Sequence, residues 1–123
     1  MDFNRYSLDK LKVAFRYYLD LHYPRSNEKT RQTQISDAFC LFRWMSEEEA
    51  WKCLELMTDP ESGIHASLKK GLAETVLKNR KHPEKDAVAY LCKAERLAQF
   101  LKLAEMVDAA RIRLPREIRI EKK

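Results

Sequence analysis

The segment from Pro83 to Arg111 constrains the fold of this chain more than any other part of the sequence. It contains no glycine, no proline after its first residue, and mostly strong helix formers. Proline suits the first helical position, and the acidic Glu84 and Asp86 fall in the first turn, where the helix dipole favours negative charge. Apolar residues recur three or four positions apart: Ala87, Leu91, Ala94, Leu97, Leu101 and Ala104. We therefore predict one amphipathic helix about 42 Å long, which is longer than a small domain is wide.

The composition predicts that this long helix belongs to an all-α fold. The chain has 123 residues, of which 45% are hydrophobic and 35% are charged, so it can form one domain with a real core. It has only two glycines and four prolines, whereas a β-rich fold needs many tight turns. We predict a compact bundle of four to five helices with the longest one last. Residues 1–111 form the helical domain in this prediction.

The first two helices are predicted from capping residues and from proline. Ser7 can cap the first helix, and this helix should end before Tyr23 because the residue preceding a proline is pushed out of the α conformation. The polar segment 25–28 offers the next N-cap. A second helix should then run to about Met45, with its apolar face concentrated towards its end.

Two more helices are predicted before the long one. Ser46 and Glu49 have the spacing of a capping box, so a third helix should begin here and bury Trp51 and Leu54. We interpret the acidic residues 47–49 as a favourable helix start in preference to a metal or catalytic site. After a loop at 58–63, a fourth helix should span about 65–79, and Gly71 in its middle is interpreted as a point of close helix contact.

The C-terminal residues 112–123 change to an alternating pattern, and we predict an extended basic tail. Ile112, Leu114, Ile118 and Ile120 share one parity, and basic residues mostly occupy the other. Pro115 keeps this segment out of any sheet interior. Three alternatives stay open: the tail lies along the helical body, it pairs with a partner strand, or it frays.

The residue types that usually carry chemistry do not form a recognisable constellation. The histidines His22, His65 and His82 are far apart and lack metal-binding spacings, and two glycines cannot build a phosphate loop. Cys40, Cys53 and Cys92 form no CxxC pair and lie among apolar residues, which is typical of buried thiols in a reducing compartment. We predict a non-enzymatic, cytoplasmic protein without metal or cofactor. No apolar run reaches the length of a membrane span, so no membrane partner is predicted.

Charge separates along the chain and supplies the candidate binding residues. Residues 1–31 carry seven basic and four acidic groups, residues 32–63 carry two and seven, and residues 64–123 carry fifteen and eight. Clustered cations can follow a phosphate backbone, although they can equally be an ordinary solvated surface. The candidate nucleic-acid-binding residues are Arg25, Lys29, Arg31, Lys69, Lys70, Lys78, Arg80, Lys81, Arg111, Arg113, Arg116 and Arg119.

Residues 7–45 carry a resemblance to a known family. They contain Tyr17-Tyr18-Leu19, a Pro24-Arg25-Ser26 turn, Thr30-Arg31, Ser36-Asp37, and then Phe39 with Leu41-Phe42-Arg43-Trp44. In these features the segment resembles the first helical hairpin of the core-binding (SAM-like) domain of tyrosine recombinases. The resemblance implies DNA binding through Arg25, Lys29 and Arg31. The chain departs from the family at the acidic segment 46–49 and lacks the recombinase catalytic domain, so strand-transfer chemistry is not implied.

We therefore predict a binding module whose partner is nucleic acid, either DNA or RNA, or a nucleoprotein complex. Its affinity should fall steeply with salt, and charge reversal of Lys69, Lys70, Arg80 and Lys81 should weaken binding to all sequences alike. The alternative is a protein-protein interaction module, such as an adaptor, an inhibitor or a small subunit of a larger assembly. It would use the long helix and the tail, with self-association through residues 112–123 as one form.

Overall fold

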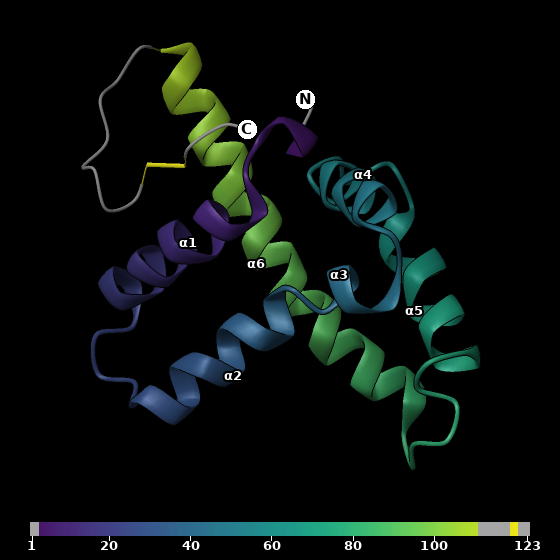
Figure 1. The fold of residues 1–123 in the computed structure, drawn as a ribbon. Coiled ribbons are helices and arrows are strands. Elements are labelled where there is room, and N and C mark those ends of the chain that lie inside the picture. The colour runs from purple at the N-terminus through teal and green to yellow at the C-terminus, as the bar shows by residue number, and fades with distance from the viewer. Residues whose placement is uncertain (1–2, 111–118, 121–123) are drawn as a thin grey trace.

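The computed structural model describes residues 3–110 and 119–120, and their regular secondary structure is helical (Figure 1). A short 3-10 helix and six α-helices follow one another: η1 (Phe3–Arg5), α1 (Leu8–His22), α2 (Glu28–Ala38), α3 (Leu41–Trp44), α4 (Glu47–Met57), α5 (Ile64–Glu74) and α6 (Pro83–Ala109). The predicted all-α fold with a long final helix is confirmed. None of the helices in these residues is long and apolar enough to cross a lipid bilayer.

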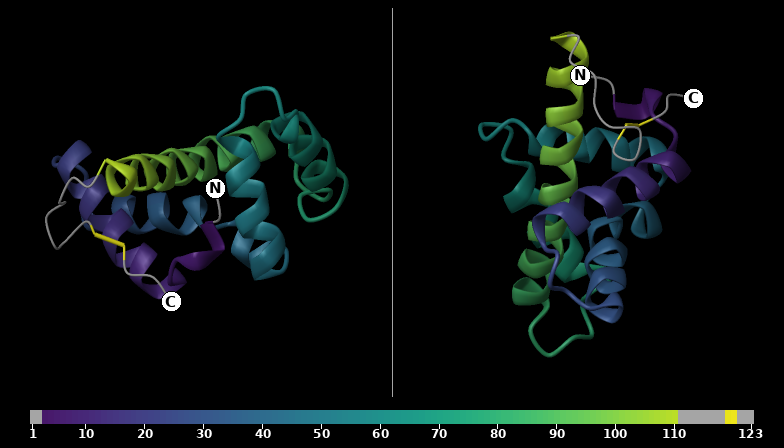
Figure 2. Two further views of the ribbon diagram at one scale, coloured as in Figure 1. Left: turned by 90° about the horizontal axis from the view of Figure 1, so that it is seen from above. Right: turned by 90° about the vertical axis from the view of Figure 1, so that its left-hand side faces the viewer.

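The long helix α6 is the element around which the other helices pack. It has 27 residues, and α2, α4 and α5 all contact it. In Figure 1, α1 and α2 lie on one side of α6, and α3, α4 and α5 lie on the other; Figure 2 gives two further views of this arrangement. All six residues of the predicted apolar stripe are buried: Ala87, Leu91, Ala94, Leu97, Leu101 and Ala104. Leu103, which lies beside that stripe in the sequence, is exposed.

Aromatic side chains join the N-terminal helices to α6. The ring of Phe15 lies 6.0 Å from that of Phe39 and 5.7 Å from that of Phe100. All three side chains are buried, and so is Trp51, which makes an edge contact with Phe42 at 5.0 Å. The rings of Phe39 and Phe42 are 5.9 Å apart, so these aromatic side chains form one contiguous group from α1, α3, α4, α6 and the bend after α2.

The predicted helix starts are confirmed by the observed caps. The side chain of Ser7 accepts a hydrogen bond from the backbone N–H of Lys10 at 3.4 Å. Asn27 caps α2 in the same way, and Ser46 caps α4 by accepting from the N–H of Glu49 at 3.2 Å. The first helix ends at His22, before the Tyr23–Pro24 bond, as the steric restriction before proline requires.

The second helix is shorter than predicted because the chain bends at Phe39 and Cys40. Ala38, Phe39, Cys40 and Leu41 are all buried. Consecutive residues of a helix point about 100° apart, so four in a row cannot face one core on a straight helix. The bend separates α2 from the short α3, and the guanidinium of Arg43 closes it by donating to the backbone carbonyl of Ser36 at 2.6 Å.

The fourth predicted helix also ends early, at Glu74. The backbone leaves the helix at Thr75, and the N–H of Leu77 donates to the carbonyl of Leu72 at 2.9 Å. This turn directs the side chain of Leu77 into the core, where it is buried. The expectation that Gly71 marks a close helix contact is wrong, since a Cβ atom at this position would meet nothing within 4 Å.

Described residues near both ends of the sequence pack against the helical body. Phe3 and Tyr6 are buried, and Arg5 pairs with Glu105 of α6. Ile120 is also buried and packs into the same core cluster, so the predicted tail contributes one residue to the domain. The rest of that tail, 112–118 and 121–123, lies outside the described residues, and the domain boundary at 111 stays a prediction.

Candidate nucleic-acid interface

The candidate cations are divided by the structure into separate groups. Arg25 and Lys29 are exposed at the turn between α1 and α2. Lys69 and Lys70 lie on α5, and Lys78, Arg80 and Lys81 lie in the turn that joins α5 to α6. Arg119 is exposed, while Arg111, Arg113 and Arg116 lie outside the described residues. The α1–α2 turn and the α5–α6 turn lie far apart, on different sides of α6 (Figures 1 and 2).

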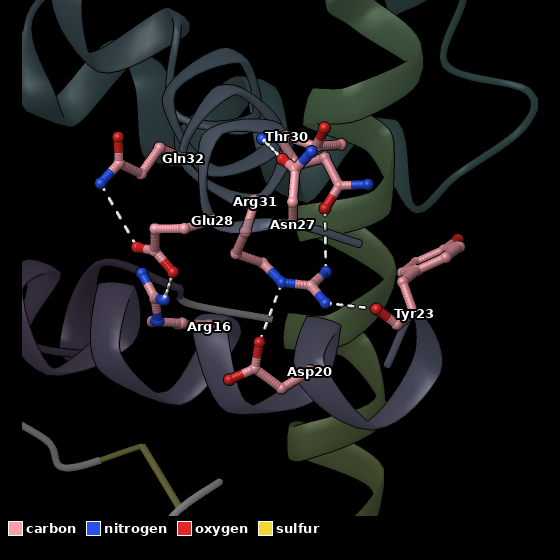
Figure 3. A network of polar contacts seen from close by, with 9 residues as sticks. Arg16, Asp20, Tyr23, Asn27, Glu28, Thr30, Arg31 and Gln32 are labelled. Carbon is pink, nitrogen blue, oxygen red and sulfur yellow. Dashed lines mark hydrogen bonds and ion pairs between the residues drawn. The ribbon is translucent and has the colours of Figure 1, made fainter. Parts of the chain in front are cut away.

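Arg31 is removed from the candidate set, because its side chain is used inside the protein. It is 3% exposed, whereas the resemblance implied a contact with DNA. Its Nε donates to Oδ1 of Asp20 at 2.9 Å, and its Nη1 donates to Oε1 of Gln34 at 2.8 Å. Nη2 donates to the backbone carbonyl of Tyr23 at 2.5 Å (Figure 3). A guanidinium that is desolvated and bonded on all three nitrogens cannot also reach a phosphate.

The α1–α2 turn is built around the carbonyl group of Tyr23. This oxygen also accepts a hydrogen bond from the backbone N–H of Ser26 at 3.1 Å, which closes a four-residue turn. Pro24 occupies the second position of that turn, where its restricted φ is favourable. The N–H of Tyr23 in turn donates to Leu19 of α1 at 2.8 Å. The backbone of the turn is therefore held from α1, from its own N–H groups and from Arg31.

An open pocket of about 420 Å³ lies at this turn. Its lining residues are His22, Tyr23, Pro24, Arg25 and Ser26. Arg96 approaches from α6, with its Cζ 5.0 Å from the centre of the Tyr23 ring. Sequence reasoning missed Arg96, since nothing in the local pattern of α6 relates it to a tyrosine at the far end of α1. The result is a surface in which aromatic rings and cations lie together.

A second group of cations surrounds the α5–α6 turn. Lys70, Lys78 and Lys81 are exposed and form no ion pair within the described residues. Arg80 is more constrained. Its Nη1 lies 3.6 Å from Oδ2 of Asp86, and its Nη2 donates to the hydroxyl of Tyr90 at 3.3 Å. The lysines are thus the freer cations of this turn, and Arg80 is partly held by α6.

Lys69 differs from its neighbours because it lines a groove between α5 and α6. The groove has a volume of about 300 Å³ and also includes His65, Val88, Cys92 and Glu95. Nε2 of His65 lies 3.5 Å from Oε2 of Glu95. In the part of the chain that the structure describes, no three His, Cys, Asp or Glu residues are grouped closely enough to hold a metal ion.

One group of acidic residues lies in α4 and the loop that follows it. Helix α4 carries Glu47, Glu48 and Glu49 in its first turn, and the segment 46–61 holds six acidic residues and one basic one. Residues 69–85 hold six basic residues and two acidic ones. Because α5 separates these segments, α4 and the α5–α6 turn lie at opposite ends of that helix (Figure 1).

Reactive-thiol chemistry is disfavoured at two of the three cysteines. Burial raises the pKa of the Cys40 thiol to about 11. Burial also raises the pKa of Cys53, and neighbouring Glu49 acts in the same direction. Because the thiolate is the nucleophilic form, both groups are held in their unreactive state near neutral pH.

The resemblance of residues 7–45 to the core-binding domain of tyrosine recombinases is supported only by the sequence features of that segment. Comparison of the chain with protein-family models, with curated proteins and with solved structures gives no match.

Proposed function

We propose that this protein is a non-enzymatic helical module that binds nucleic acid, alone or within a nucleoprotein complex, through phosphate contacts. The observation that carries the proposal is the state of three lysines, one on α5 and two in the α5–α6 turn. Lys70, Lys78 and Lys81 are exposed and form no ion pair with any described carboxylate, although the chain has 19 acidic residues. Cations that no internal carboxylate neutralises are available to an external polyanion.

The contacts of such a module are with the backbone of the nucleic acid. Lysines act as point charges that displace condensed counterions from phosphates, and they carry little sequence information. Arg25 and Lys29 supply a smaller group of the same kind at the α1–α2 turn. Because the two turns lie on different sides of α6, each can be tested separately for its part in binding.

The experiment is a titration of labelled duplex DNA and RNA by fluorescence anisotropy at several salt concentrations. With four phosphate contacts, the affinity for duplex DNA should fall about 100-fold between about 50 and 200 mM salt. The double variant Lys78→Glu/Lys81→Glu should weaken binding to all sequences alike and lower the salt slope by about two. Arg25→Glu/Lys29→Glu makes the equivalent test of the α1–α2 turn.

A matched control separates a local effect from a change in net charge. The double variant Lys52→Glu/Lys102→Glu changes the net charge by the same amount, but its substitutions lie on α4 and α6, away from both basic turns. It should retain the salt slope of the unchanged protein. The proposal is wrong if no nucleic acid is bound at low salt, or if binding is insensitive to salt. It is equally wrong if both basic-turn variants behave as the control does.

A second candidate function is protein-protein interaction, and exposed apolar side chains favour it. Val13, Tyr17 and Leu21 lie four residues apart on α1, and Leu21 is 69% exposed. On α6, Leu103 and Met106 are also exposed. Large exposed apolar side chains that gather on a helix face are typical of contact sites. Light-scattering mass measured over a wide concentration range tests self-association, with Leu103→Lys/Met106→Lys as the variant and Val76→Lys as an exposed apolar control.

The cytoplasm is the location that fits this proposal. All three cysteines are free in the structure, which suits a reducing compartment.

A further inference from the structure

The pocket at the α1–α2 turn has features that a simple phosphate-binding surface does not need. Two aromatic side chains, His22 and Tyr23, line it together with Arg25. Tyr23 is 37% exposed, and His22 is exposed at the end of α1. Lysines and arginines are sufficient to neutralise phosphates, and aromatic rings do not contribute to that neutralisation. Rings beside cations are instead the combination that holds an unpaired base and its backbone.

The rings of this pocket are the outer end of an aromatic series that begins in the core. The ring of Phe100 lies 4.7 Å from that of Tyr18, and Tyr18 lies 4.3 Å from His22. His22 lies 6.5 Å from Tyr23. Tyr18 is half-buried and Phe100 is buried, so the exposed ring of His22 packs on rings that are themselves held in the core. Its orientation is consequently set by the core and not only by the turn.

Cations occupy the outer end of this series. The guanidinium of Arg96 lies over the Tyr23 ring, and Arg25 belongs to the pocket itself. Lys29 is exposed in the first turn of α2, close along the chain. This cation–π contact helps to hold the Tyr23 ring in place from one face. The free cations beside it can meet the phosphates on either side of a base.

The backbone of the pocket is also fixed before any ligand arrives. Arg31 and the N–H of Ser26 both bond to the carbonyl of Tyr23. The carboxylate of Asp20 holds the guanidinium of Arg31 in turn (Figure 3). A site that needs no ordering on binding loses less conformational entropy, and more of the contact energy remains as affinity. This is a physical reason for burying an arginine beneath an exposed turn.

We infer that the α1–α2 turn binds an unpaired nucleotide unit of a single strand, with its base against His22 and Tyr23 and its phosphates on Arg25 and Lys29. This inference rests on the proposed nucleic-acid binding and makes it more specific. In a duplex the base faces are stacked on one another, so only the phosphates could reach this turn. A single strand offers both its base faces and its phosphates, so it should bind to this turn more tightly than a duplex does.

The test compares three labelled probes of the same length, about 12 nucleotides, at one low salt concentration. They are a thymidine single strand, a single strand with abasic sites at all internal positions, and a duplex. The abasic strand has the same phosphate charge without the bases. The thymidine strand should bind at least about fivefold more tightly than the abasic strand, which corresponds to about 1 kcal/mol of stacking.

Variants assign this difference to the pocket. Tyr23→Ala should remove the preference for the thymidine strand over the abasic strand, while Tyr23→Phe should keep it. Tyr17→Ala is the matched control, because Tyr17 is an exposed tyrosine of the preceding helix α1 and does not line the pocket. Arg25→Ala should weaken the binding of both strands by the same factor. His22→Ala provides a second test if circular dichroism shows that Tyr23→Ala disturbs the fold.

The possible results separate this inference from the proposed function. Salt-dependent binding with equal affinity for the thymidine and abasic strands overturns the stacking inference and leaves the proposed function intact. An absence of binding to all three probes at low salt overturns both. If thymidine monophosphate competes as strongly as the strand, the pocket takes a free nucleotide and the assignment to a single strand is wrong.

Discussion

The guanidinium of Arg31 and the backbone carbonyl of Tyr23 are joined by a hydrogen bond of 2.5 Å. This bond links α2 to the turn that precedes it, and the arginine is almost completely buried. Bonds from charged donors contribute more to stability than neutral ones, and a buried guanidinium is tolerated only when its N–H groups are satisfied. Arg31 is thus a structural residue in a basic segment whose other cations, Arg25 and Lys29, are exposed.

Replacement of Arg31 should therefore destabilise the fold. We expect Arg31→Ala to lower the free energy of unfolding by about 2 to 3 kcal/mol, because charge-assisted bonds to Asp20, Gln34 and Tyr23 are lost together. Arg31→Lys should recover only part of this, since an ammonium cannot reproduce the planar fork. Urea unfolding measures the change. The exposed Arg25→Ala should stay within about 0.5 kcal/mol, and equal effects of the two alanine variants would contradict the structural role.

The two glycines should respond to substitution in opposite directions. Gly71 lies inside α5 with open space where a Cβ atom would be, so Gly71→Ala should stabilise the protein by about 1 kcal/mol. Gly63 has φ of +71° at the N-cap of α5, and Gly63→Ala should destabilise it by about 1 kcal/mol. Thermal unfolding of both variants measures the difference, and a destabilised Gly71→Ala would show that this face of α5 is covered in solution.

Stability should fall at alkaline pH because of Tyr6. Burial is the main cause that raises the pKa of its phenol from 10.0 to about 12. Between these values the unfolded chain loses the proton before the folded protein does, so ionisation favours the unfolded state. The contribution is complete below pH 10 and is lost as the pH rises towards 12. At pH 11 the loss should be about 1 kcal/mol.

Urea unfolding at pH 9 and pH 11 tests this expectation. Tyr6→Phe lacks the titrating hydroxyl, and its stability should fall less between the two pH values than that of the unchanged protein. Tyr17→Phe, which changes an exposed tyrosine in the same way, serves as the control. Identical pH dependence of the Tyr6→Phe variant and the unchanged protein would rule out this role of Tyr6.

The three cysteines should be modified in a fixed order. Cys92 is exposed, Cys53 is half-buried, and Cys40 is buried with its pKa raised to about 11. At pH 8, iodoacetamide should label Cys92 first and Cys53 more slowly. Cys40 should react only when the chain unfolds. Peptide mass mapping over time gives the order, and Cys92→Ser should remove the fast phase. Rapid labelling of Cys40 in the folded protein would show that its surroundings open.

The helices and their buried faces could be predicted from local patterns. Capping by Ser7 and Ser46, the end of α1 before Tyr23, and the apolar stripe of α6 all agree with the structure. Each of these features depends on residues within about four positions of one another. The places where prediction and structure differ have a different origin. The bend at Phe39–Cys40 and the early end of α5 serve to bury side chains against partners far along the chain.

The same division applies to the candidate site. Clustered cations could be found by counting, but counting could not distinguish the buried Arg31 from the exposed Arg25 six positions earlier. The rings of Tyr18 and His22 have helical spacing, so their contact could have been anticipated. The contact of Arg96 with Tyr23 could not, because it depends on how α1 is placed on α6.

The amino-acid sequence alone determined that the chain is helical, that the last helix is the longest, and that acidic and basic groups occupy different segments. These properties follow from propensity, capping and composition, which act between near neighbours in the chain. Only the tertiary structure decided which cations are exposed and which rings lie beside them. The physical reason is that exposure and non-local contacts depend on the helices packed around a residue, and residues close in sequence can face opposite environments.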